Sequence, residues 1–312
     1  MRGVDFHCDV LYKMLQNNEL AFQGSAVGGL DVTYERLKFA GSALQTFAIF
    51  IPQHLNDRME PILESIDLFY RHVLACEDMM LITTSGELRA CMEQGKIGAL
   101  LSLEGVDGLQ GNLSMLRIAE KLGVRAAGLT WNYSNWAADG VMESRGAGLT
   151  SQGKRFVEEC NKLKIIVDVS HLSERAFWDV AELSASSFIA SHSNTQAKCN
   201  HPRNLTDNQI KGIIARDGLI GITYVPWFVS ESMPVTIDDL LCHIEHVCEL
   251  GGESNLMLGS DFDGIDSYML GLTHPGELSN LYDALHKQYS SELVNRFTAD
   301  NALQFLLREL PA

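Results

Sequence analysis

The chain has 312 residues, of which 46% are hydrophobic and 21% are charged, and these values exclude a disordered or a fibrous protein. Asp and Glu number 40 against 24 Lys and Arg, which gives a formal net charge of -16 at pH 7. This balance argues against nucleic acid and anionic membranes as partners, because both need clustered positive charge.

The amino terminus, MRGVDFHCDV, carries Asp5 and Asp9 where a signal peptide needs an unbroken apolar segment. No stretch reaches the roughly 20 apolar residues that a membrane span requires. The seven cysteines include no C-x-x-C pair, which argues against a disulfide framework and against a structural zinc knuckle. We therefore expect a cytoplasmic protein whose mature chain begins at this terminus.

Short β-branched or apolar runs alternate with amphipathic segments along the chain. Helical periodicity marks residues 57–77, 84–94, 113–122, 151–163, 173–184, 206–216 and 236–250. Two of these segments begin with the pattern of a capping box, at Thr84 and at Thr236. The predicted strands are residues 3–9, 43–50, 97–104, 126–131, 164–170, 187–191, 218–225 and 255–260.

Strands that alternate with helices predict parallel pairing through crossovers, and eight such units close a barrel. We therefore predict an α/β fold, a (β/α)8 TIM-type barrel. No linker or repeat divides the chain, so residues 1–312 are expected to form a single domain. The helical pattern at about 277–310 is expected to pack outside the barrel.

Polar side chains end five of the predicted strands. In a barrel of this kind the carboxyl ends of all strands meet on one face, so these side chains are expected to gather in one mouth. Imidazoles and carboxylates in one partly buried site need a compensating cation, and a divalent metal takes these nitrogen and oxygen donors. The residues concerned are His7, Asp9, Glu104, His171, His192 and Asp261.

His7 and Asp9 are two positions apart, so at the end of a strand both side chains lie on the same face and can bind one metal. An isolated H-x-D triplet is more often a satisfied polar cluster than a pair of ligands. The joint placement of the candidate ligands at several strand ends favours a metal site over that alternative.

Five longer segments surround these residues: DFHCDV at 5–10, LSLEG at 101–105, DVSHLSERAFWDV at 168–180, ASHSNTQAKCNHPRNLTDNQI at 190–210 and LGSDFDG at 258–264. Together, and in this order, they resemble the membrane dipeptidase (renal dipeptidase, M19 peptidase) family. The likeness spans residues 7–264, which is most of the chain.

The resemblance implies a metal-dependent hydrolase architecture, with two zinc ions at the mouth of the barrel. His7 and Asp9 would bind one zinc ion. His171 and His192 would bind the other, and Glu104 would bridge the two ions.

The resemblance also implies two residues that contact the substrate. Arg203 would bind the C-terminal carboxylate, which a guanidinium can hold with two parallel hydrogen bonds. Asp261 would contact the amino group and transfer protons.

The chain departs from the family after the fourth predicted strand. Many members read Leu-Thr-His there, whereas this chain has Trp131 at the histidine position, followed by Asn132 and Tyr133. Either Asn132 or Tyr133 supplies a replacement donor toward the substrate, or the second metal takes over that role.

The predicted function is a zinc-dependent dipeptidase that hydrolyses the amide bond of small dipeptides with free termini through a metal-bridging hydroxide. One alternative is another binuclear-metal amide or lactone hydrolase, in which Trp131 and Trp227 adapt the pocket to a non-peptide substrate. A catalytically silent binding barrel is the second alternative, and retention of every candidate ligand argues against it. A homodimer is the candidate assembly.

Overall fold

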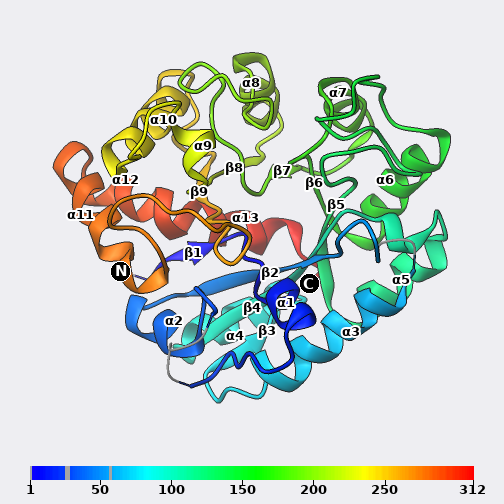
Figure 1. The fold of residues 1–312 in the computed structure, drawn as a ribbon, viewed down its shortest axis with the longest axis horizontal. Helices are drawn as coiled ribbons and strands as arrows, with labels where there is room; N and C mark the ends of the chain where they lie inside the picture. The colour runs from blue at the N-terminus through cyan, green and yellow to red at the C-terminus, as the bar shows by residue number, and fades with distance from the viewer. Residues whose placement is uncertain (1, 25–28, 56–57) are drawn as a thin grey trace.

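The computed structural model describes residues 2–24, 29–55 and 58–312. Its strands form one parallel sheet in the order β2-β1-β9-β8-β7-β6-β5-β4-β3, and a further pairing of β2 with β4 closes eight of them into a barrel. The predicted barrel is confirmed, and Figure 1 shows its helices as a ring around the strands. The strands are β1 Val4–Asp5, β2 Leu44–Phe50, β3 Met79–Leu81, β4 Ile97–Glu104, β5 Val124–Gly128, β6 Ile166–Asp168, β7 Ile189–Ala190, β8 Leu219–Ile222 and β9 Leu256–Leu258.

Each of the eight predicted runs contains or overlaps one barrel strand. The sequence did not predict β3, which pairs only with the first residues of β4 and lies outside the closed ring. A strand of three residues is too short to show a period in the sequence. It forms because the first residues of β4 have a free edge there.

The helices that cover the barrel include all seven predicted segments, although residue 57 of the first lies outside the described residues. Both predicted capping boxes, at Thr84 and Thr236, are present. The helices are α1 Val10–Gln16, α2 Tyr34–Ala40, α3 Glu60–Leu68, α4 Ser85–Glu93, α5 Leu113–Lys121, α6 Ser151–Leu163, α7 Glu174–Leu183, α8 Asp207–Ile214, α9 Pro226–Val229, α10 Ile237–Glu249, α11 Leu278–Gln288, α12 Ser291–Asn295 and α13 Asn301–Glu309. The sequence did not predict α1, α2 and α9, which are short.

The last helix, α13, lies across the amino-terminal end of the barrel, and in Figure 1 its red ribbon crosses the centre. Its Leu303, Phe305 and Leu306 share one buried cluster with an inward-facing side chain from each barrel strand. This end is therefore filled by apolar packing. The strand residues in the cluster are Val4, Leu44, Leu100, Ala126, Ile166, Ile189, Leu219 and Met257.

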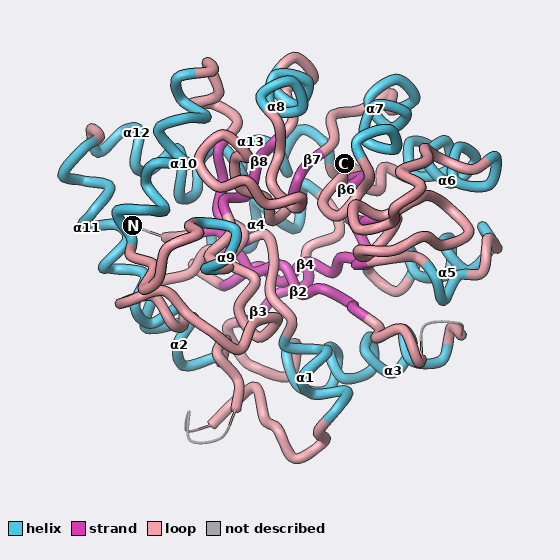
Figure 2. Tube along the Cα trace, turned by 45° about the horizontal axis from the view of Figure 1, so that its top comes forward, coloured by secondary structure: helices cyan, strands magenta, loops and turns pink. Residues whose placement is uncertain are grey.

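The opposite end of the barrel carries the long loops, which lie in front of the strands in Figure 2. Along β4, Leu101 and Leu103 pack outward against the helices, whereas Leu100 faces the interior. Strand alternation therefore directs Glu104, four residues after Leu100, into the barrel at this end. The fold leaves one mouth open for chemistry, at the carboxyl ends of the strands.

Candidate metal centre and active site

The structure brings together all six polar residues expected at the strand ends. Glu104 is the last residue of β4, and the other five follow β1, β6, β7 and β9 within a few residues. The three imidazoles and Asp9 are each at most 6% exposed. Charged or polar groups so far from water need partners, and these residues are in contact with one another. The six residues are His7, Asp9, Glu104, His171, His192 and Asp261.

Glu104 lies between two groups of donors. Its Oε1 is 2.9 Å from Nε2 of His171 and 3.8 Å from Nε2 of His192. Its Oε2 is 3.4 Å from Nε2 of His7. One carboxylate therefore presents one oxygen to each side, which is the geometry that a bridging ligand needs.

His7 is the centre of the second group. Its Nε2 lies 3.4 Å from Oδ2 of Asp9 and 3.7 Å from Oδ1 of Asp261. Ligand atoms of these three residues lie within 4.8 Å of one another, as do those of His7, Glu104 and His192. Asp261 therefore lies close enough to be a ligand as well as a substrate contact.

A hydrogen-bond chain fixes the tautomer of His192. The Ser191 hydroxyl donates to Oδ2 of Asp168, so its oxygen, 2.7 Å from Nδ1 of His192, has only an acceptor role left. Nδ1 of His192 must then carry the imidazole hydrogen, and Nε2 carries a lone pair. Asp168 therefore acts on His192 through Ser191.

His171 is fixed in the same tautomer by Asn132. Oδ1 of Asn132, which can only accept, lies 2.8 Å from Nδ1 of His171. The Nε2 lone pairs of His171 and His192 therefore face each other across 2.8 Å. Two lone pairs at that distance repel unless a cation lies against them, so this pair fits a metal.

Buried atoms without partners on the other side of Glu104 also indicate a metal site. Nε2 of His7 and Oδ1 of Asp9 are buried and have no hydrogen-bond partner among the described residues. Buried polar atoms are rarely left without a partner, and oxygen and nitrogen donors of this kind suit a divalent cation. The residues on both sides of Glu104 thus fit metal ions.

Burial and the neighbouring charges separate the pKa values of the three imidazoles. Burial and the nearby Arg203 lower the pKa of His171 to about 3, and burial with His7 lowers the pKa of His192 well below its ordinary value. Burial also acts to lower the pKa of His7, but Glu104 and Asp9 outweigh it and raise that pKa well above its usual range. Burial thus favours the neutral, metal-binding form of His171 and His192, whereas the carboxylates around His7 favour its protonated form.

Backbone strain coincides with two of these residues. His171 has φ 69° and Asp261 has φ 66°, in the left-handed region that non-glycine residues rarely adopt. Such conformations cost on the order of 1–3 kcal/mol and cluster at functional sites. Asp5, to which the sequence assigned no role at the site, holds the turn at Asp261. Its carboxylate accepts hydrogen bonds from the Ser260 amide and hydroxyl and from the His7 amide.

A cavity of about 380 Å³ opens above the carboxylates Asp9, Glu104 and Asp261. This volume lies in the range of roughly 300–1,000 Å³ that is usual for small-molecule sites. Arg203 forms part of the wall and is 4% exposed; its Nη2 donates to the His192 carbonyl over 3.2 Å, and its Nε has no partner among the described residues. A buried guanidinium with a free donor in this wall fits an anionic group of a ligand.

The loop after β5 brings three candidate residues to the same mouth in different roles. Asn132 lines the cavity, but its side-chain oxygen is occupied by His171. Tyr133 is 48% exposed and lines a small neighbouring hollow, with its ring centroid 6.3 Å from that of Trp131. Trp131 itself lines the cavity and lies 6.2 Å, between ring centroids, from His171.

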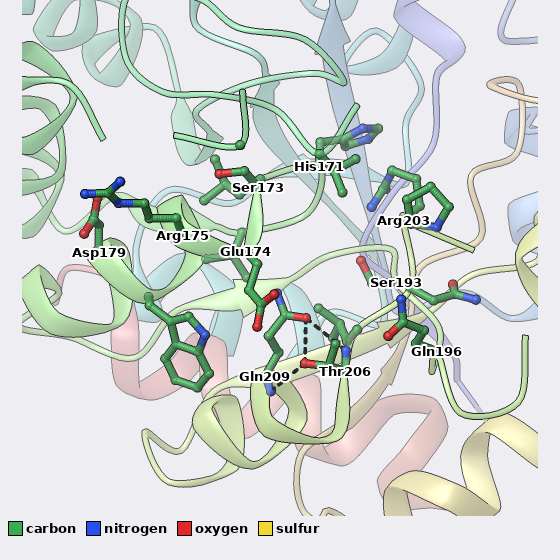
Figure 3. A pocket seen from close by; sticks show the side chains of 18 residues that line it. His171, Ser173, Glu174, Arg175, Asp179, Ser193, Gln196, Arg203, Thr206 and Gln209 are labelled. Carbon is green, nitrogen blue, oxygen red and sulfur yellow. Dashed lines mark hydrogen bonds between the residues drawn. The ribbon is translucent and has the colours of Figure 1, made fainter. Parts of the chain in front are cut away.

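A larger cavity of about 670 Å³ lies behind His171 and Arg203, near the first turns of α7 and α8. Figure 3 shows His171 and Arg203 close together at one end of this cavity, with Glu174 and Gln209 further along. None of the three carboxylates at the metal centre lines it. The smaller cavity, which they do line, is therefore the candidate site of reaction.

The two histidines of α10 lie in different surroundings. His243 is fully buried: its Nε2 lies 2.8 Å from the Val229 carbonyl, and its Nδ1 lies 3.1 Å from the Thr195 amide. These contacts tie α10 to the loop after β7. His246 lies partly exposed and pairs with Asp207 of α8 at 2.8 Å.

The closed parallel barrel, with histidines and carboxylates converging at its carboxyl mouth, defines a metal-dependent hydrolase of the barrel type. The chain belongs to the membrane dipeptidase family, peptidase family M19, whose family model matches residues 1–309. It is thus a member of a metallo-dipeptidase family, and the resemblance found in the sequence is confirmed. Among the described residues, no helix has both the length and the apolar character needed to cross a bilayer.

Relatives and solved structures agree with this assignment. The chain is 30% identical to dipeptidase tcpJ of Claviceps purpurea over 284 residues, which cover 87% of this chain and 67% of that protein. An uncharacterized protein from the pqqA 5' region of Klebsiella pneumoniae is 33% identical, over 79% of this chain and 93% of that protein. The crystal structure of the M19 metallopeptidase called dipeptidase AC superposes with a TM-score of 0.92 at 28% identity and covers 100% of this chain and 99% of that one.

A metallopeptidase from Rhodobacter sphaeroides has the same fold, with a TM-score of 0.91 at 27% identity over 99% of each chain. That protein was crystallised with a phosphinate mimic of the dipeptide L-Ala-D-Ala.

Proposed function

We propose that this chain is a zinc-dependent dipeptidase that binds two metal ions and hydrolyses the amide bond of small dipeptides with free termini. The observation that carries the proposal is the position of Glu104, with one oxygen toward His171 and His192 and the other toward His7. His7 and Asp9 would hold one ion, and His171 and His192 the other. Bound there, two zinc ions would supply an acidified water as nucleophile and would polarise the scissile carbonyl.

The residues of the chain orient the substrate and move its protons. Arg203 binds the C-terminal carboxylate with its free donor, which fixes the dipeptide relative to Glu104. Asp261 faces the same cavity and accepts a proton that it then passes to the leaving amine. In the metal-free chain, burial and the carboxylates Asp9 and Glu104 raise the pKa of Asp261 well above its usual range.

Metal analysis followed by a dipeptide panel tests the proposal. Purified protein reconstituted with zinc is expected to hold two ions per chain and to release both amino acids from free dipeptides. Dipeptides blocked at the C-terminus are expected to react poorly. Fewer than one bound ion per chain after reconstitution, or no hydrolysis of any dipeptide by the loaded protein, would overturn the proposal.

Trp131 favours the second candidate, a binuclear-metal amide or lactone hydrolase of non-peptide substrates. Its indole takes the position where many family members have an imidazole, and it changes the chemistry of the wall beside His171. Hydrolysis of lactones or simple amides by a loaded enzyme that leaves dipeptides intact would select this alternative.

All seven cysteines lie in the described part of the chain, and each is a free thiol there. The cytoplasmic location, the single domain and the homodimer stay predictions.

A further inference from the structure

One side of the reaction cavity is built from three aromatic rings, Tyr12, Phe50 and Trp131, which we call the aromatic wall. The ring centroids of Tyr12 and Phe50 are 5.1 Å apart, and those of Phe50 and Trp131 are 5.3 Å apart. All three side chains are partly exposed, so their faces are available to a ligand. Rings in mutual contact form a surface that keeps its shape and favours apolar partners.

The barrel topology puts Phe50, one ring of the aromatic wall, opposite Arg203. Phe50 ends β2, and Arg203 lies in the loop after β7. In the closed ring β2-β1-β9-β8-β7-β6-β5-β4, four steps separate β2 from β7 in either direction. These strands are therefore diametrically opposed across the mouth, with Glu104 of β4 next to Phe50 in register.

This opposition orients a bound dipeptide. A C-terminal carboxylate on Arg203 places the C-terminal residue on the β7 side of the mouth. The chain of the dipeptide then runs past Glu104, so its N-terminal residue lies on the side of the aromatic wall.

The N-terminal α-carbon has an amine and a side chain that must point in different directions. Asp261 follows β9, and Trp131 follows β5; these strands are also four steps apart around the ring. An amine directed at Asp261 leaves the opposite side of the mouth, where Trp131 lies, for the side chain.

We propose that the aromatic wall binds the side chain of the substrate's N-terminal residue, so that the enzyme selects dipeptides with a large apolar or aromatic residue at that position. This inference rests on the proposed dipeptidase function. It assigns Trp131 and Phe50 as the residues that determine specificity.

Charged N-terminal side chains fit the aromatic wall poorly. A side chain of either sign would leave water for a surface of three rings, which costs free energy unless the charge is paired. A basic side chain could stack on the indole, but two divalent ions would outweigh the three carboxylates and repel it. An apolar side chain meets neither penalty.

Steady-state kinetics of the zinc-loaded enzyme test the selection. The substrates are X-Ala dipeptides with Phe, Leu, Ala, Gly, Asp or Lys as X, together with the reversed dipeptide Ala-Phe. Phe-Ala and Leu-Ala are expected to exceed Gly-Ala by about ten- to a hundredfold in kcat/KM, because the wall buries one large side chain. Most of the difference is expected in KM, because the wall contacts the side chain equally in the ground state and in the transition state.

Substitutions in the wall should remove this preference. Trp131→Ala and Phe50→Ala are expected to bring Phe-Ala to within a few-fold of Gly-Ala, while Trp131→Phe keeps most of the preference. Trp178→Ala is the matched control, because Trp178 is also partly exposed but lines the larger cavity behind His171. It should leave the preference unchanged.

Binding of non-hydrolysable probes gives a second readout. Calorimetry with phosphinate dipeptide mimics that carry either a benzyl or a methyl group at the N-terminal position should show tighter binding of the benzyl compound to wild type. The difference should be lost in Trp131→Ala. Metal content and circular dichroism of each variant identify loss of folding, in which case Trp131→Leu and Phe50→Leu replace the alanine variants.

The outcomes separate the two levels of the proposal. If the loaded enzyme cleaves no dipeptide, the dipeptidase function fails. If it cleaves dipeptides with no preference at the first residue, with a preference set only by the second residue, or with a preference that survives in Trp131→Ala and Phe50→Ala, the aromatic-wall assignment is overturned and the dipeptidase function stands.

Discussion

Asn132 Oδ1 lies 2.8 Å from Nδ1 of His171 and so holds the Nε2 lone pair of that imidazole toward His192. Removing this partner leaves the ring free to rotate and to change tautomer. We predict that Asn132→Leu weakens metal binding by about 10–100-fold, the usual effect of losing an outer hydrogen bond to a ligand. Titration against a chelator measures it. Asn132→Asp keeps the acceptor and should retain metal, and wild-type affinity in Asn132→Leu would contradict this role.

Glu104→Gln is expected to be more damaging than Asn132→Leu. The amide has nearly the same shape, but it removes the one negative charge that faces both groups of donors. Metal content and kcat/KM should both fall by more than the roughly 10–100-fold expected for an outer partner. Wild-type turnover in Glu104→Gln would exclude a bridging role.

The pKa shifts predict how the metal-free protein titrates. His171, with its pKa lowered to about 3, should remain neutral at pH 5. The pKa of His192 is also lowered and that of His7 is raised, so His192 should titrate below the usual range of histidine and His7 above it. Nitrogen chemical shifts of the imidazoles, followed by NMR between pH 4 and pH 8, measure this directly. A midpoint near about 6.5 for His171 would show that the site is open to water.

The pKa shifts of His171 and His7 change the stability of the fold in opposite directions as the pH changes. For His171 the unfolded chain binds the proton first as pH falls, so its contribution is complete above about 6.5 and is lost down to about 3. For His7 the folded state holds the proton more tightly, so its contribution is present below about 6.5 and is lost as pH rises through its folded pKa.

Arg203 is predicted to recognise the C-terminal carboxylate. A hydrogen bond to a charged group is worth about 1.5–3 kcal/mol, so Arg203→Ala should lower kcat/KM by roughly ten- to a hundredfold without loss of metal. Arg203→Lys keeps the charge but not the two-pronged geometry and should fall between. Amidation of the substrate's C-terminus should lower kcat/KM of the wild-type enzyme by the same factor. It should lower kcat/KM of Arg203→Ala only a little further. If the two losses multiply, the carboxylate is bound elsewhere.

His243 is predicted to stabilise the fold through the loop after β7. In His243→Leu, the buried amide of Thr195 and the carbonyl of Val229 lose their partner, at a cost of roughly 1–3 kcal/mol for each unsatisfied group. Urea unfolding measures the loss. The control is His246→Ala, which removes a partly exposed pair with Asp207 and should cost no more than about 1 kcal/mol. Equal effects of the two substitutions would argue against a stabilising role for the buried hydrogen bonds of His243.

Much of this protein follows from local patterns in its sequence. The eight apolar runs and the helices between them predict the barrel because alternation and capping are properties of neighbouring residues. The candidate ligands could be predicted for the same reason: His7, Glu104, His171 and His192 each stand at or just after the end of a run, and parallel strands bring such ends together.

Only the tertiary structure decided which residues support and surround these ligands. The Asp168 carboxylate contacts Ser191, and Ser191 in turn contacts His192. His243 is buried and links α10 to the loop after β7. Helix α13 fills the amino-terminal end of the barrel. The placement of Phe50 opposite Arg203 depends on the pairing of β2 with β4, which closes the ring. Such relations depend on distances between segments far apart in the chain, and these are fixed when the barrel closes and its core packs, not by the residues on either side of each position.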